Sequence, residues 1–329
     1  MKLRDEIRGT IFEYSLIKKK ESILLAVSGG PDSVAMTYIL NELRSELGFN
    51  MALGYFHHGI RRESDREQEY VGSLASNFKI DFYTKKSDVP LISKKEKRSL
   101  EDIARRERYK FLVSTAKRKS FNKIAVAHNS DDQAETLLQR LIRGSGLKGF
   151  KGISFKMDMN GVEIVRPLLA SSRKEIEKYL EKNKISPCID KSNFDIKFNR
   201  NKVRHELIPY IEKEFNPNIK ELLCKTASNM SQLHGFIEVE IEDAFKRCVK
   251  KESSYVKIKT DRLKRFHPYI MAELTRRAVE VVKGDLKRLE YSHWKEIESL
   301  IYERPDNSVV DLPGGIRVKK IKSWITVGR

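Results

Sequence analysis

The sequence predicts an α/β protein: a doubly wound, mostly parallel five-stranded sheet, followed by a smaller, mainly helical C-terminal domain. Short β-rich apolar runs alternate with longer helical patterns through the first half of the chain, as in a parallel sheet covered on both faces. This rhythm stops near residues 215–218, and 329 residues exceed what one ordinary domain needs. We therefore expect a first domain at 1–213 and a second at 214–329.

Five apolar runs are the predicted strands of the sheet. In chain order they are residues 23–27, 51–56, 80–83, 123–127 and 162–165. A helix is expected at 34–47, and another begins where Ser99 and Asp102 can form a capping box. Near the end of the chain, residues 312–315 (Leu-Pro-Gly-Gly) separate a Val-rich from an Ile-rich run and predict a small β-hairpin region.

The charge balance is strongly basic. Lys and Arg number 65 against 46 Asp and Glu, a formal net charge of +19, which suits a polyanion such as nucleic acid. A merely well-solvated Lys-rich surface is the alternative, and composition does not decide between the two.

Other classes of protein are disfavoured by what the sequence lacks. The charged start contains no apolar stretch of signal-peptide length, and no run approaches the roughly 20 residues that span a bilayer. We therefore expect a cytoplasmic protein with no membrane partner. The three cysteines contain no CxxC pair, so zinc and iron–sulfur sites are not expected. The oligomeric state stays open, a homodimer included.

A glycine loop directly after the first predicted strand is the clearest functional signal. Its residues are Ser28, Gly29, Gly30, Pro31, Asp32 and Ser33. A strand, a glycine turn and a helix N-terminus gather backbone N–H groups at the positive end of the helix dipole, which suits phosphate. Walker A and GxGxxG patterns are both absent. The alternative is a turn that only joins strand to helix.

Asp32 needs a separate explanation, because a carboxylate beside phosphate is repulsive unless a cation lies between them. A Mg²⁺ contact, direct or through water, supplies that cation. Capping of the following helix is the alternative and does not exclude metal.

The loop resembles the SGGxDS loop of the PP-loop ATP pyrophosphatases, a superfamily that splits ATP into AMP and pyrophosphate. The resemblance implies ATP and Mg²⁺ as cofactors, with residues 28–33 around the pyrophosphate part of ATP.

Three further segments resemble the lysidine synthase family within that superfamily. The first, 56–64, carries His57, His58, Arg61 and Arg62 at the end of the second strand. We expect His57 to help bind the nucleotide there, whereas a lone histidine is more often structural.

The second segment, 104–109, places Arg105 and Arg108 on one helical face, where they can hold phosphates of ATP or RNA. A solvated basic face is the alternative.

The third segment, 127–136, is the most diagnostic. It places His128 at the end of a strand and Asp132 and Glu135 on one face of the following helix, where Asp131 could join an acidic cluster. Asp131 can equally be a structural partner of the helix dipole. Segments at 166–176, 190–193 and 200–209 also resemble the family.

By this resemblance, the substrate is the wobble cytidine of a CAU-anticodon tRNA(Ile). ATP adenylates the cytidine, and free L-lysine then attacks C2 and expels AMP. His128, Asp132, Glu135, Asp32 and Arg200 are the expected catalytic residues, with Arg204 a further candidate for phosphate or substrate contacts. An attacking amine of pKa about 10.4 needs a carboxylate to recognise its cation and relay a proton.

Two rivals remain at this point: another PP-loop enzyme, such as a tRNA-thiolating one or an amide-forming synthetase, and a non-catalytic RNA-binding protein. The lysidine synthase hypothesis requires residues 28–33 and 128–135 to face each other across one crevice.

Overall fold

The structure is a computed structural model that describes residues 2–60, 63–188 and 199–329. The chain divides into two compact units, residues 1–231 and 232–329, and the division falls inside helix α11 (Ile219–Cys248). The predicted boundary at 213/214 coincides with the end of α10 (Ile208–Glu214), five residues before α11 begins. The domain boundary at 213/214 therefore remains a proposal, distinct from the division of the chain into two compact units.

The first unit contains a six-stranded sheet in the order β3-β2-β1-β4-β6-β5. All neighbouring strands are parallel except β5, which pairs antiparallel with β6 at one edge. The five predicted strands are present, and the antiparallel edge strand β5 was not predicted. The bounds are β1 Ser22–Ala26, β2 Asn50–His57, β3 Phe82–Lys86, β4 Lys123–Val126, β5 Lys156–Met159 and β6 Val162–Val165.

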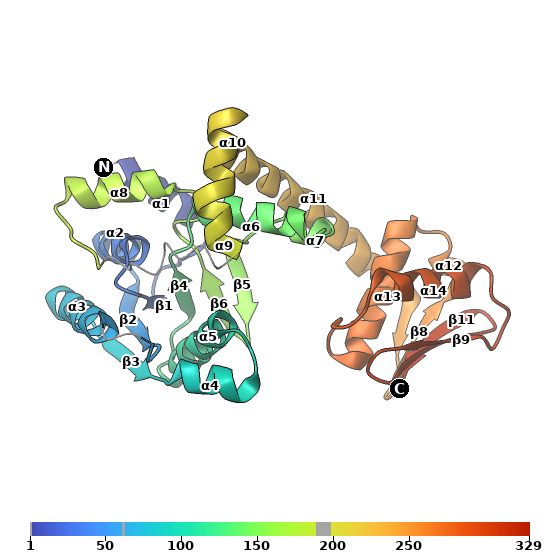
Figure 1. Cartoon of the computed structure of the whole chain (residues 1–329). Coiled ribbons are helices and arrows are strands. Elements are labelled where there is room, and N and C mark those ends of the chain that lie inside the picture. Colours follow the sequence, from blue (N-terminus) through green and yellow to red (C-terminus); the bar gives the residue numbers. More distant parts are fainter. Residues whose placement is uncertain (1, 61–62, 189–198) are drawn as a thin grey trace. The chain divides into compact units, whose positions relative to one another are not determined.

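Helices cover both faces of this sheet (Figure 1). The side chains of β1 alternate, so that Ile23 and Leu25 pack among α1, α2, α3 and α8, whereas Leu24 packs among α4 and α5. Strands buried on both faces need continuous apolar sequence, which is why the runs were recognisable. The helices are α1 Lys2–Glu13, α2 Pro31–Leu47, α3 Glu63–Phe78, α4 Val89–Glu96, α5 Leu100–Arg118, α6 Ser130–Ile142, α7 Leu147–Phe150 and α8 Arg173–Lys182.

A continuous helical segment follows and packs against α6. It consists of α9 (Asn199–Lys202), a π-helical turn η2 (Val203–Leu207) and α10. Ala134 and Leu138 of α6 form a small core with Val203 and Ile208 of this segment. The two elements are therefore held side by side at the carboxyl edge of the sheet.

The second unit is built around a five-stranded antiparallel sheet, in the order β7-β8-β11-β10-β9. The predicted hairpin is confirmed as β9–β10, with Leu312 opposite Ile316 and with Gly314 and Gly315 at φ +88° and +71°, angles that favour glycine. The expectation of a mainly helical domain missed β7 and β8. The elements are β7 Val249–Lys251, β8 Tyr255–Lys259, α12 Thr260–Leu263, α13 Pro268–Lys283, α14 Tyr291–Tyr302, β9 Val309–Leu312, β10 Ile316–Ile321 and β11 Trp324–Gly328.

Across the described ranges of both units, no helix combines the length and apolar character needed to cross a membrane.

Candidate nucleotide and substrate site

The glycine loop joins β1 to α2 as predicted. Gly29 has φ +85°, an angle that favours glycine, and Gly30 is the N-cap of α2 without any side-chain cap. Inside the loop, the Ser33 hydroxyl donates to the carbonyl oxygen of Gly30 (2.9 Å) and accepts from the backbone N–H of Ser28 (3.1 Å). The serines therefore fix the shape of the loop, and the first turn of α2 has no side chain capping its N–H groups.

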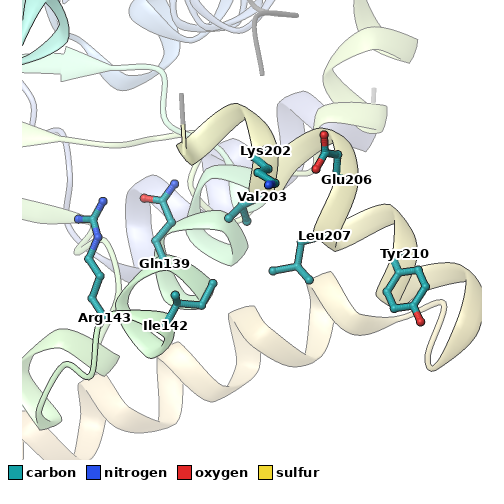
Figure 2. A pocket seen from close by; sticks show the side chains of 8 residues that line it. All are labelled: Gln139, Ile142, Arg143, Lys202, Val203, Glu206, Leu207 and Tyr210. Atoms are coloured by element: carbon teal, nitrogen blue, oxygen red, sulfur yellow. The ribbon is translucent and has the colours of Figure 1, made fainter. Parts of the chain in front are cut away.

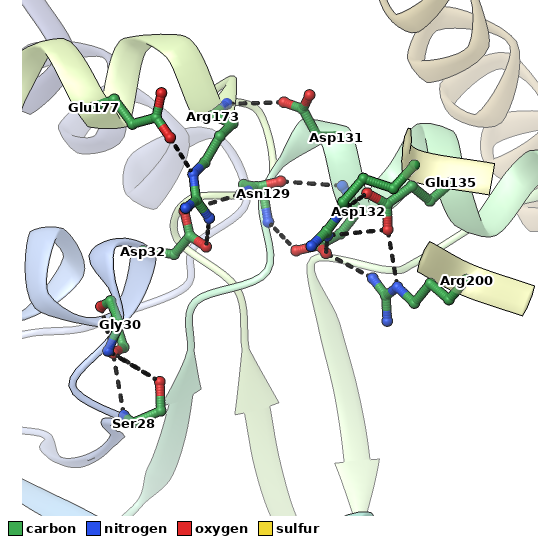
Figure 3. A network of polar contacts seen from close by, with 12 residues as sticks. Ser28, Gly30, Asp32, Asn129, Asp131, Asp132, Glu135, Arg173, Glu177 and Arg200 are labelled. Atoms are coloured by element: carbon green, nitrogen blue, oxygen red, sulfur yellow. Dashed lines mark hydrogen bonds and ion pairs between the residues drawn. The ribbon is translucent and has the colours of Figure 1, made fainter. Parts of the chain in front are cut away.

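Asp32, in the first turn of α2, connects the loop to two other elements (Figure 3). One carboxylate oxygen accepts a hydrogen bond from Asn129 Nδ2 (3.1 Å), and the other pairs with Arg173 Nη1 of α8 (2.6 Å). Burial raises the pKa of Asp32 to about 6, against the opposing effect of the Arg173 charge. The carboxylate is thus an anion held in place at the edge of the loop.

Helix α6 begins in the Asp-rich stretch, as predicted. Asn129 is its N-cap and accepts from the backbone N–H of Asp132 (3.0 Å), while the Asp132 carboxylate accepts from the backbone N–H of Asn129 (3.0 Å). This capping box leaves the second carboxylate oxygen of Asp132 for other partners. Asp132 therefore has both a structural role and a position in the site.

Those partners are two arginines. Arg200 bonds to Asp132 (2.6 Å) and to Glu135 (2.9 Å) (Figure 3). Arg204 also contacts both carboxylates. Glu135 is almost fully buried, with 1% of its surface exposed. Burial lowers the pKa of Arg200, but the charges of Asp132 and Glu135 outweigh that effect and raise the pKa above its ordinary value. The result is a compact cluster of two carboxylates and two guanidinium groups.

Asp131 does not join this cluster. Its carboxylate accepts from the backbone N–H of Arg173 (2.8 Å) and pairs with Lys220 Nζ of α11 (3.0 Å). The structure thus gives Asp131 a role in joining α6 to α8 and α11.

His128 lies just before α6, against Arg166. Arg166 Nε donates to His128 Nδ1 (3.2 Å), so the neutral ring carries its hydrogen on Nε2. Burial lowers the pKa of His128 to about 3, and the charge of Arg166 acts in the same direction while Asp132 opposes it. At neutral pH His128 is therefore an uncharged hydrogen-bond donor.

Two arginines of α5, Arg105 and Arg108, lie around one aromatic ring. The guanidinium carbons of Arg105 and Arg108 are 5.0 and 5.6 Å from the ring centre of Tyr109. Burial lowers the pKa of Arg108, and the positive charges of Arg105 and Arg200 lower it further. Arginines from α5 and α9 thus approach one another, which concentrates positive charge beside the site.

His57 is in a different environment. It is 2% exposed, its Nδ1 accepts from the backbone N–H of Gly59 (3.1 Å), and its Nε2 lies 3.0 Å from an Asp65 oxygen. Both ring nitrogens are used within the protein, so the structure shows His57 ordering the turn after β2. Nucleotide binding by His57 remains a prediction, and Arg61, Arg62 and residues 190–193 lie outside the described residues.

The glycine loop and α6 line one cleft of about 600 Å³. Pro31 of the loop lies on its wall together with Asn129 and Glu135, which meets the requirement that the two segments face each other. Both signs of charge are present. The other charged groups on the wall are Asp131, Arg173, Glu177, Glu181, Arg204 and Lys220.

No role was predicted from the sequence for two residues of this network. Arg173 pairs with Asp32 across 141 positions of sequence, and Asn129 bonds to Asp32 across 97. The segments containing both had been noted, but without a role for either side chain. A capping residue and a helix-start arginine have ordinary structural explanations, so their contacts with Asp32 are visible only in the folded arrangement of α2, α6 and α8.

Comparisons with known proteins agree with this geometry. Residues 3–211 match a family described as the PP-loop domain. The chain is 35% identical to a tRNA(Ile)-lysidine synthase of Caldanaerobacter subterraneus subsp. tengcongensis, over 98% of this chain and 68% of that protein. It is 42% identical to the tRNA(Ile)-lysidine synthase of Thermosipho africanus, over 69% of this chain and 52% of that one.

Among solved structures, a U34-tRNA thiolase from Methanococcus maripaludis is similar in fold. The TM-score is 0.59 at 17% identity, covering 70% of this chain and 78% of the thiolase. The match supports the α/β architecture of the first unit. With a matched PP-loop domain and relatives of one name along most of its length, the chain belongs to the tRNA(Ile)-lysidine synthase family of PP-loop proteins.

Proposed function

We propose that this enzyme uses ATP to ligate free L-lysine to C2 of the wobble cytidine in a CAU-anticodon tRNA(Ile), releasing AMP and pyrophosphate. The observation that carries the proposal is one cleft lined by Pro31 of the glycine loop and by Glu135 and Arg204, which belong to the ion-pair cluster with Asp132 and Arg200. One side offers donors for phosphate, and the other offers carboxylates for an ammonium group.

The first step activates the base. The C2 oxygen of the cytidine attacks the α-phosphorus of ATP, the bond to the β-phosphate breaks, and pyrophosphate leaves. The uncapped N–H groups of α2 and the loop residues 28–33 support pyrophosphate binding. Arg105, Arg108 and Arg200 are the groups proposed to neutralise the charge that develops on the phosphates.

Mg²⁺ fits this site as a companion of ATP. Within the part of the chain that the structure describes, no three His, Cys, Asp or Glu side chains could hold a metal by themselves. Mg²⁺ is commonly bound by one or two carboxylates together with substrate phosphates, and Asp32 supplies one such carboxylate at the loop. Bound there, Mg²⁺ would neutralise phosphate charge, while Arg173 would have to release Asp32.

The second step is attack by lysine. Its amine displaces the adenylated oxygen from C2, and AMP leaves with that oxygen. Asp132 and Glu135 are the proposed carboxylates that recognise the ammonium group and accept its proton before attack. The mixed charge of the cleft wall suits an amino acid that carries both signs. His128 Nε2–H is a neutral donor for the base or the leaving phosphate.

The ion pairs imply an exchange of partners. In the structure Arg200 and Arg204 neutralise Asp132 and Glu135. ATP offers the arginines new anions, and lysine offers the carboxylates a new cation. Each ligand therefore frees the group that the other needs. Since ATP, free lysine and tRNA meet in the cytoplasm, we place the reaction there.

The test is to measure pyrophosphate release with a tRNA(Ile) transcript, with and without lysine, and to analyse the nucleosides by mass. We expect release to require the RNA and lysidine to form only with lysine. Asp32→Ala should abolish turnover and leave tRNA affinity largely intact. Pyrophosphate release that ignores RNA would point to another PP-loop reaction, and a wild type that consumes no ATP with any RNA would leave only RNA binding.

A further inference from the structure

A second pocket lies next to the cleft, within the first unit (Figure 2). Its volume is about 600 Å³, and its walls come from the C-terminal half of α6 and from the α9–η2–α10 segment. The mechanism above does not use it. The lining residues are Gln139, Ile142, Arg143, Lys202, Val203, Glu206, Leu207 and Tyr210.

The pocket combines apolar walls with an incomplete polar group. Ile142 is 66% exposed and Tyr210 58%, unusual values for side chains of this size. Gln139 also lines the pocket, and among the described residues its buried Nε2 atom has no hydrogen-bond partner. A buried amide donor without an acceptor is costly, so a turn of this side chain toward an acceptor on a ligand in the pocket would satisfy it.

The charges on the rim favour a nucleotide. Arg143 and Lys202 are cations, suited to the phosphates on either side of a base, and Glu206 is an acceptor for an exocyclic amino group. Apolar side chains and a Tyr ring suit the flat faces of a base, because every base has a π-face that stacks on aromatic rings. All four bases also carry ring or carbonyl acceptors for the Gln139 amide.

The position agrees with this ligand. Gln139 follows Glu135 by one turn of α6, about 6 Å along the helix axis. On the facing segment, Val203 and Leu207 line the pocket while Arg204, between them in sequence, lines the cleft. The two cavities are thus neighbours on the same pair of helical segments.

We propose that this pocket binds an unstacked base of the tRNA anticodon loop, adjacent to the cytidine that is modified. The inference rests on the proposed function, since it takes RNA as the substrate. Holding the neighbouring base apart would open the stack from which the reacting cytidine must be withdrawn. Tyr210 and Gln139 are then positioning residues for the RNA.

The test uses an anticodon stem–loop RNA in which 2-aminopurine replaces the adenine that follows the cytidine in CAU. With the wild type we expect a saturable fluorescence change on binding. Tyr210→Ala should remove most of that change and raise the KM for RNA about tenfold, the scale of one base–aromatic stack, with the KM for ATP unchanged. Tyr210→Phe keeps the ring and should restore both readouts.

Phe12→Ala is the matched control, because Phe12 is an aromatic residue of similar exposure, 59%, on α1. Gln139→Leu should weaken RNA binding without affecting the folded structure, which ATP binding would verify. The proposal is overturned if Tyr210→Ala modifies the RNA with wild-type KM and fluorescence. It is also overturned if Tyr210→Ala changes only the self-association of the protein, measured by sedimentation. A wild type inactive on RNA would instead refute the proposed function.

Discussion

Replacing Glu135 by Gln is the most direct test of the ion-pair cluster. Glu135 is almost fully buried and accepts from both Arg200 and Arg204. The variant keeps the shape of the side chain but leaves two guanidinium groups facing the single carboxylate of Asp132. Breaking a fully buried pair costs about 3–5 kcal/mol. Here the arginine side chains are 31% and 33% exposed, so water replaces part of the interaction.

We therefore expect Glu135→Gln to lower the free energy of unfolding by about 2 kcal/mol. For a unit of this size, that corresponds to a fall in Tm of roughly 4–8 °C. Lysine should lose one of its two carboxylate partners, with a rise in its KM of roughly 10- to 100-fold. RNA-dependent pyrophosphate release should persist, because the adenylation step does not use this carboxylate.

Thermal unfolding and lysine titrations of AMP release measure these effects. Glu177→Gln is the matched control: the same chemical change, on the wall of the same cleft, at a side chain 59% exposed and paired with Arg173 one turn away. Its stability should change by less than about 0.5 kcal/mol. If Glu135→Gln matches this control in both Tm and lysine KM, the cluster is neither the stabilising centre nor the lysine site.

Three further predictions concern the loop and the coupling between ligands. Since the fold raises the pKa of Asp32 to about 6, the folded state binds the proton more tightly, and stability is lost as pH rises from about 4 through 6. As the pH rises between those values, the free energy of unfolding of Asp32→Asn should therefore increase by about 1–3 kcal/mol relative to that of the wild type. Urea unfolding at low and neutral pH measures this change, and the same difference between the two proteins at both pH values would contradict the reasoning. A nonhydrolysable ATP analogue should tighten lysine binding on the order of tenfold in calorimetry, and equal affinities would contradict the exchange of ion-pair partners. Gly29→Ala, at φ +85°, should lower the free energy of unfolding by about 1–2 kcal/mol and weaken ATP binding severalfold. Unchanged ATP affinity would argue against the loop as the phosphate-binding site.

The sequence was informative where local chemistry decides structure. The buried runs of β1 and β4 are apolar on both faces, and Asn129 with Asp132 starts α6 by side-chain contacts within four residues. Both features depend only on neighbours along the chain, so the five strands and the starts of α5 and α6 were predicted, while α2 begins three residues before the predicted 34.

Two of the missed elements, β5 and β7, lack such signals. β5 has the sequence Lys-Met-Asp-Met and lies at the edge of its sheet, and β7 is only three residues long with two lysines. Edge strands bury little, and their pairing depends on a partner strand. The second unit is helical with a small sheet, as expected, but that sheet is larger than the predicted hairpin region.

In the site, residue types were predicted better than pairings. Asp132, Glu135 and Arg200 meet, but nothing local indicates that Arg173 reaches Asp32 or that Asp131 turns toward Lys220. Those contacts depend on where α8 and α11 lie, which is a property of the whole unit. For His57, two hydrogen-bonded ring nitrogens are a tertiary detail that a two-histidine motif does not reveal.

The π-helical turn η2 gives the helical segment around it an unusual consequence. Side chains of this five-residue turn face two different sites. Arg204 faces the carboxylates, whereas Val203 and Leu207 face the apolar pocket. A shift of this short turn must carry both sets of side chains together. Under the proposed RNA binding, the seating of a base in the pocket and the alignment of the Arg204 guanidinium are therefore coupled through one turn of helix.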